Sequence, residues 1–292
     1  FMFPVMTARW WLLLKTFGTP LSLLQLSIYR NAANSISYIT PGPHFGGEPF
    51  LVYLLHQRHQ ISASSAATSV IIDRILELIA SIMILTICLL YLLRADSAFF
   101  TGSHELLIIL PVLAAFLLIL AALAQGKKPA SRLLDFFSRL QVWPFLKHYK
   151  TAETFTQQIR QGERLTEELF RRHRRQFISA NLLSIVHWLW IFIEFWLMAF
   201  FLGSSLSFIQ LISVVVAARL AFFTPLPAGI GVLESALPYV TAALGLGSSL
   251  GIGLCLIIRF RDILFTLTGV GQSMGYLTCF KKISIINDKQ LK

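Results

Sequence analysis

The sequence has 292 residues, of which 55% are hydrophobic and only 13% charged, and its mean hydropathy is +0.69. Several apolar runs reach the ~20 residues that a helix needs to cross a bilayer, so the composition excludes a water-soluble enzyme and predicts an all-α polytopic membrane protein with a single transmembrane domain over residues 1–292. The net charge of +11 comes from basic residues beside the apolar runs. The positive-inside rule explains this distribution, and we expect no nucleic-acid partner.

The three cysteines, Cys88, Cys255 and Cys279, lie apart from one another within or at the ends of apolar segments. They have neither the spacing of metal ligands nor that of a disulfide framework. The sequence also lacks a nucleotide-binding glycine loop and a nucleophile beside a base. We therefore expect no metal and no cofactor.

The first apolar run extends from Trp10 to Leu26 and is interrupted by Lys15, Gly18 and Pro20. It lacks the charged start, the unbroken apolar middle and the small-residue cleavage site of a signal peptide. The pattern predicts an interfacial segment or a broken first helix.

Residues 34–50, with the sequence NSISYITPGPHFGGEPF, form an interruption rich in proline and glycine. Proline lacks the amide donor that a helix needs, and glycine permits backbone angles that other residues resist. We predict a broken or re-entrant helical hairpin that presents Glu48. Its backbone positions are Thr40, Pro41, Gly46 and Gly47.

Residues 63–93 predict a helix long enough to cross the bilayer with tilt, and Asp73, Arg74 and Glu77 lie about halfway along it. Their spacing of three or four residues places them on one side of the helix. Because each charge near a bilayer centre costs ~2.5–3.5 kcal/mol, we expect the three to face protein rather than lipid. They form a substrate or proton site, a self-neutralising cluster that ties this helix to its neighbour, or both at once.

A polar loop at residues 94–104 precedes an apolar span at 105–124, and residues 126–176 then hold a large share of the lysines and arginines. The positive-inside rule places this basic segment in the cytoplasm. It is either a topology signal alone or also a contact for anionic lipid headgroups.

The predicted span at residues 177–202 carries His187 and Glu194 one heptad apart, so both lie roughly on one side of the helix. A lone histidine in a membrane helix is more often a satisfied packing residue than a proton relay. Glu194 keeps the relay open as the second interpretation.

A second interruption, Thr224 to Ser235 (TPLPAGIGVLES), follows the apolar run 206–223, which carries Arg219. Freed backbone groups at bilayer depth are tolerated only where protein or a water-filled cavity satisfies them. We predict a second broken or re-entrant hairpin, with Glu234 directed into a polar site and Arg219 within its reach; a surface loop between two spans is the alternative. The backbone positions of this hairpin are Thr224, Pro225, Pro227, Gly229 and Gly231.

The two interruptions correspond in sequence, and so do the charged helices after them. The residues TPGP at 40–43 align with TPLP at 224–227, and IIDRIL at 71–76 aligns with IIRFRDIL at 257–264, which contains Arg259, Arg261 and Asp262. With the basic segment inside, the first charged helix runs outwards and the second inwards. We predict an inverted repeat of residues 31–94 and 206–278 in a bundle of about six or seven segments, as in secondary transporters.

The segments PGPHFGGEPF, IIDRILEL and PLPAGIGVLES, with an arginine downstream of the last, resemble in order and spacing the lysylphosphatidylglycerol synthase transmembrane-region family, also described as flippase-like and UPF0104-type. The resemblance covers Asn31 to Tyr276. It implies a multi-pass protein of the cell inner membrane that moves or handles lipids, fused in some members to a soluble aminoacyl-transferase domain. Because the sequence stops soon after its last apolar segment, we expect no aminoacylation of lipid.

We expect a lipid translocator that moves a phosphate-bearing lipid or lipid-linked precursor, since guanidinium groups match phosphate oxygens bidentately. Two alternatives stay open: a membrane-embedded transferase acting on a lipid-linked substrate, and a non-catalytic assembly subunit whose buried charges only pair internally. Membrane lipids are the expected partners, and the sequence does not define the oligomeric state. The expected substrate-binding residues are Glu48, Asp73, Arg74, Glu77, Arg219, Glu234, Arg259, Arg261 and Asp262.

Overall fold

The computed structural model of the chain describes residues 2–16, 21–40, 46–95, 174–224 and 226–290. Every regular element in these ranges is helical, which confirms the all-α prediction for this part of the chain. The predicted span at residues 105–124 lies outside the described residues, as do Pro41, Pro225 and nearly all of the basic segment 126–176.

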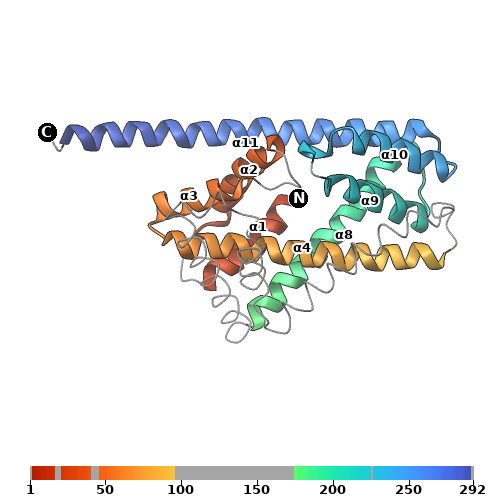
Figure 1. The fold of residues 1–292 in the computed structure, drawn as a ribbon, viewed down its shortest axis with the longest axis horizontal. Coiled ribbons are helices and arrows are strands. Elements are labelled where there is room, and N and C mark those ends of the chain that lie inside the picture. Colours follow the sequence, from red (N-terminus) through yellow and green to blue (C-terminus); the bar gives the residue numbers. More distant parts are fainter. Residues whose placement is uncertain (1, 17–20, 41–45, 96–173, 225, 291–292) are drawn as a thin grey trace, which may run out of the picture.

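The described elements in chain order are α1 (Met2–Thr16), α2 (Leu23–Ile39), α3 (Glu48–His59), α4 (Ala63–Arg94), α8 (Arg174–Phe201), α9 (Phe208–Phe222), the 3-10 turn η2 (Pro227–Gly229), α10 (Val232–Ala243) and α11 (Ser248–Gln290). Figure 1 shows that α4 and α11 run in opposite directions along the length of the molecule. The helices α2 and α10 pack on α11, whereas α1, α3, α8 and α9 contact α4. Each of the shorter α-helices therefore contacts at least one of the two long helices.

Serine residues fix the start of several described helices. The hydroxyl groups of Ser22 and Ser62 each accept the backbone N–H three residues later, at the heads of α2 and α4. Ser207 and Gln210 form a reciprocal capping box at the head of α9. These side chains satisfy amide groups that the first turn of a helix leaves without a partner.

Two of the described helices are long and apolar enough to cross a bilayer, namely α4 and residues 178–201 of α8. The apolar helix α9 is shorter, with 15 residues. The helix α11 has 43 residues, but its N-terminal half carries Arg259, Arg261 and Asp262. The described chain agrees with a helical membrane protein, whereas the total of about six or seven segments stays a prediction.

The first interruption begins later than the sequence predicts. The helix α2 continues through Asn34 and ends at Ile39, so the break starts at Thr40. Polar residues remain helical here because the helix and its neighbour satisfy them: the Ser35 hydroxyl donates to the Ala32 carbonyl at 2.7 Å. The first apolar run is also divided between two helices, in agreement with a broken first helix.

Two large hydrophobic cores lie along α4, one on each side of its charged segment, and a small third cluster with Ile72 and Leu76 lies at that segment. One core contains Ala66 and Val70 of α4 together with side chains of α1, α2 and α3. The other contains Ala80 and Leu92 of α4 together with side chains of α8, α9, α10 and α11. Asp73 falls between these positions, so the charged segment lies at the boundary of the two cores.

Candidate functional site

A buried carboxylate, Asp73 of α4, holds one arginine from each of the first two helices. Arg9 Nε lies 2.7 Å from Asp73 Oδ1, and Arg30 Nη2 lies 2.7 Å from Oδ2. The exposed fractions of Arg9, Arg30 and Asp73 are only 1%, 5% and 4%. The ion pairs are important because a buried charge without a partner costs several kcal/mol. The sequence analysis missed Arg9 and Arg30, although a single arginine inside an otherwise uncharged stretch was a usable signal.

Glu77, one turn further along α4, extends this arrangement. Its Oε2 accepts hydrogen bonds from Arg9 Nη2 at 3.2 Å and from Arg74 Nη1 at 3.0 Å. We call the whole set the Asp73 network; it comprises Arg9, Arg30, Glu48, Asp73, Arg74 and Glu77. Its arginines and carboxylates balance in charge, so it joins α1, α2, α3 and α4 as a self-neutralising cluster, one of the two interpretations that the sequence left open.

Glu48 is the first residue of α3 and closes the end of that helix. Its Oε2 accepts the Gly46 N–H at 2.7 Å, and its Oε1 lies 2.8 Å from Arg74 Nε. Gly47 lies against α2, where a Cβ atom would come 2.0 Å from the Ala33 carbonyl oxygen. Only glycine lets α3 begin so close to α2. This close contact explains why a glycine directly precedes Glu48.

Glu234, in the first turn of α10, makes contacts that match those of Glu48. Its Oε2 accepts the Gly231 N–H at 2.7 Å, and its Oε1 lies 2.5 Å from Arg259 Nε of α11. Arg259 also donates to the carbonyl groups of Ala228 at 2.9 Å and Gly229 at 3.4 Å. The break in the helix frees these carbonyl groups, and the arginine satisfies them.

Arg219 does not reach Glu234 as the sequence predicted, because Arg259 occupies that place. The helix α11 packs along α10 and presents Arg259 to the glutamate. Arg219 of α9 instead lies over the indole ring of Trp188, 5.3 Å from the ring centroid. Among the described residues it forms no ion pair within 4 Å.

Arg261 of α11 joins this helix to α8. It forms an ion pair with Glu194, and its Nη2 lies 2.7 Å from the Asp262 Oδ1 atom. We call Arg261, Glu194 and Asp262 the Arg261 cluster. Glu194, which the sequence paired with His187 as a relay, therefore has an arginine as its direct partner.

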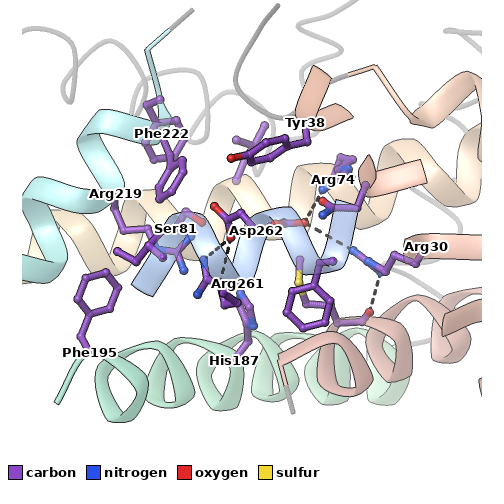
Figure 2. Close-up of a pocket in the computed structure, with 17 residues that line it drawn as sticks. Arg30, Tyr38, Arg74, Ser81, His187, Phe195, Arg219, Phe222, Arg261 and Asp262 are labelled. Atoms are coloured by element: carbon purple, nitrogen blue, oxygen red, sulfur yellow. Dashed lines mark hydrogen bonds and ion pairs between the residues drawn. The ribbon is translucent and has the colours of Figure 1, made fainter. Parts of the chain in front are cut away.

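These charged groups meet around a cavity of about 170 Å³ between α1, α2, α4, α8, α9 and α11 (Figure 2). The predicted substrate-binding residues that line it are Arg74, Glu77, Arg219, Arg261 and Asp262. The predicted residues outside its lining are Glu48, Asp73, Glu234 and Arg259. The lining residues that the sequence analysis did not assign to a substrate site include Arg30, Asn34, Tyr38 and His187. We refer to this space as the central cavity.

The groups around the central cavity combine charged, polar and aromatic side chains. In the part of the chain that the structure describes, no group of three or more histidine, cysteine or acidic residues could hold a metal ion. Aromatic side chains such as Phe195 and Phe222 complete the lining. The cavity thus combines fixed guanidinium and carboxylate groups with an apolar wall.

Comparison with known proteins agrees with this architecture. The sequence profile of the family described as the lysylphosphatidylglycerol synthase TM region matches residues 1–269. The chain belongs to this family. A UPF0104 membrane protein from Pyrococcus horikoshii is 25% identical over 235 residues, which cover 77% of this chain and 68% of that relative. No solved structure matches the chain significantly.

Membership of the lysylphosphatidylglycerol synthase TM region family confirms the resemblance drawn from the three short motifs and identifies a membrane protein. The outer faces of its helices fit that environment. Large apolar side chains such as Ile87 of α4, Phe200 of α8 and Phe260 of α11 are 59%, 59% and 65% exposed. A soluble monomer rarely exposes so many large apolar side chains, whereas lipid chains cover them well.

Proposed function

We propose that the protein is a lipid translocator, which moves a phosphate-bearing lipid or lipid-linked precursor across the cytoplasmic membrane. The observation that carries this proposal is the central cavity, in which charged groups from several helices gather inside an apolar bundle. Ionisable groups inside a membrane protein are costly and typically mark the path of a polar substrate. A lipid headgroup is such a substrate, and its acyl chains can remain along the apolar helix faces.

The two glutamate-headed helices support an inverted repeat around this path. The helices α3 and α10 have 12 residues each, so at 1.5 Å per residue they are about 18 Å long and too short to cross the ~30 Å hydrocarbon core. Each is followed by a long helix, and α4 and α11 run in opposite directions (Figure 1). Re-entrant hairpins in inverted units are a recurring design of transporters with a central binding site.

The balance of charge in the lining favours an anionic headgroup. Four arginines line the central cavity, Arg30, Arg74, Arg219 and Arg261, against the carboxylates Glu77 and Asp262. An arginine keeps its charge when buried and matches two phosphate oxygens at once. We assign the protein to the inner membrane as a multi-pass component, with the basic segment 126–176 on the cytoplasmic side near anionic lipids.

The proposal is tested by reconstituting the purified protein into liposomes with headgroup-labelled phospholipids, a labelled polyprenyl phosphate and an uncharged glycolipid. A membrane-impermeant quencher reports how much of each probe changes leaflet. We expect faster movement of at least one phosphate-bearing probe than in protein-free liposomes, and no faster movement of the uncharged lipid. If no probe moves, while the same protein forms a product from a radiolabelled lipid-linked donor, the protein is a transferase instead.

A further inference from the structure

We infer that Arg219 and His187 form a phosphate-binding subsite within the central cavity. The subsite would take the phosphate of a lipid headgroup, and that choice of source rests on the translocator proposed above. The assignment itself stands on the contacts of the two side chains. These contacts distinguish Arg219 from the other arginines that line the cavity.

The other lining arginines are already occupied by carboxylates. Arg30 is held by Asp73 at 2.7 Å, and Arg74 is held by Glu48 at 2.8 Å and by Glu77 at 3.0 Å. Arg261 is held by Glu194 and Asp262. Turning any one of them towards a ligand would break an ion pair that it already makes with a carboxylate of the chain.

Arg219 differs from these arginines because it forms no ion pair within 4 Å among the described residues, although Glu194, Asp262 and Glu77 lie near enough to interact with it electrostatically. Its Nε is buried and has no hydrogen-bond partner, and no carboxylate of the described residues lies within 4 Å of its guanidinium group. The nearby carboxylates Glu194 and Asp262 are both bound to Arg261. A half-buried arginine whose buried Nε lacks a hydrogen-bond partner favours an anion that is not part of the chain.

His187 supplies a second buried polar atom in the lining. The residue is 5% exposed, and its Nδ1 atom has no hydrogen-bond partner. Figure 2 shows His187 and Arg219 in the lining of the same cavity, on α8 and α9 respectively. Either a neutral imidazole with a proton on Nδ1 or an imidazolium could donate a hydrogen bond there.

The ring of Trp188 helps to prepare the subsite. Arg219 stacks over this ring at 5.3 Å from its centroid, and Trp188 is the residue next to His187 on α8. Stacking on an aromatic ring orients the guanidinium plane while its N–H groups remain available in that plane. The two donors therefore come from neighbouring helices, and Trp188 lies beside one of them, Arg219.

Phosphate is the anion that fits this arrangement best. Two donors on different helices suit a ligand with several acceptor oxygens; a tetrahedral phosphate presents its oxygens in three dimensions, whereas a carboxylate presents two in one plane. A phosphate charge would also screen Arg219 from Arg261, with which it interacts electrostatically. The cavity of about 170 Å³ is an order of magnitude larger than the ~10–15 Å³ needed for one water molecule.

The experiment measures equilibrium binding of radiolabelled phosphatidic acid to the full chain in a maltoside detergent and a phosphate-free buffer. We compare the parent protein with Arg219→Gln, Arg219→Lys and His187→Gln, and with Arg94→Gln as a control at an exposed arginine at the end of α4. The expected Kd rises about ten-fold or more for Arg219→Gln and several-fold for His187→Gln. Arg219→Lys keeps part of the affinity, and the control keeps all of it.

Competitors identify the source of the phosphate. Diacylglycerol, which has no phosphate, should not displace the probe, and inorganic phosphate should do so only at much higher concentration than phosphatidic acid. Equal potency of inorganic phosphate would support the anion subsite but contradict a lipid source. A parental Kd in Arg219→Gln overturns the inference.

Separate measurements of folding and of lipid transport distinguish a failed subsite from an unfolded variant and from a failed translocator. Removing an unpaired buried cation should leave the Tm of the ligand-free protein unchanged or raise it, so Arg219→Gln is expected to remain folded. If binding depends on Arg219 but no lipid crosses the bilayer, the subsite stands and the translocator fails. If lipid crosses but Arg219→Gln binds like the parent, the translocator stands and the subsite fails.

Discussion

Glu48 and Glu234 have equivalent surroundings in two distant parts of the chain. Each lies in the first turn of a 12-residue helix and accepts the N–H of a preceding glycine at 2.7 Å. Each also faces an arginine of the long helix that follows, Arg74 or Arg259. The glutamate thus links the broken segment to the next helix in both units.

Exchanging the charges of Glu234 and Arg259 should keep an ion pair between these two positions without keeping lipid transport. The double variant Glu234→Arg with Arg259→Glu places opposite charges at the same sites, but a glutamate at 259 cannot donate to the carbonyl groups of Ala228 and Gly229. We expect transport to be lost in the reconstituted assay. Full transport by this variant would support an assembly role in which the charges only pair internally.

Asp73→Asn should strongly destabilise the fold. The substitution removes the carboxylate that neutralises Arg9 and Arg30 in the interior, and breaking a buried ion pair costs about 3–5 kcal/mol. Thermal unfolding in detergent should show a clearly lower Tm. Arg94→Gln at the exposed end of α4 is the control, and an equal loss in both variants would contradict the role assigned to the network.

Two glycines of α11 provide a matched test of its packing on α2. At Gly269, a Cβ atom would come 2.5 Å from the Asn31 carbonyl oxygen, whereas at Gly271 nothing lies within 4 Å. We expect Gly269→Ala to lower stability by about 1–3 kcal/mol through overpacking. Gly271→Ala should be neutral or stabilise by up to ~1 kcal/mol through helix propensity. Equal effects in denaturant unfolding would refute the close approach of the two helices.

Cysteine accessibility tests whether the second break is re-entrant. Single cysteines replace Leu226 and Tyr239, which are 44% and 66% exposed, in a chain whose three native cysteines are serine. Because α10 is too short to cross the bilayer, we expect an impermeant maleimide to reach both positions from the same side. Labelling from opposite sides would show a membrane span instead.

The sequence predicted the breaks and the acidic residues at them because these depend on local chemistry. Proline and glycine cluster around Thr40 and Thr224, and such clusters disfavour a continuous helix through local backbone chemistry alone. The charges at Asp73 and Glu77 were equally visible, since carboxylates are rare in an apolar helix of this length.

The partners of these charges were not predictable in the same way. Arg9 and Asp73 are 64 positions apart, and their contact follows from how α1 packs on α4. The prediction that Arg219 reaches Glu234 was wrong for the same reason. Arg219 is closer to Glu234 along the chain, but the packing of α11 on α10 brings Arg259 to this glutamate instead. The end of α2 at Ile39 was also missed, since local serine hydrogen bonds keep a polar stretch helical.

The most direct test of the account is lipid movement by Glu48→Gln and Glu234→Gln in proteoliposomes, with Ser235→Ala, an exposed neighbour in the same turn of α10, as the control. Glu234 is partly exposed, with 41% of its side chain accessible, so its loss should cost at most about 1 kcal/mol of stability. The account predicts that both glutamine variants fold but move the phosphate-bearing probe no faster than protein-free liposomes, while the control moves it at the parental rate. Parental rates in both glutamine variants would contradict a translocation path built on these two residues.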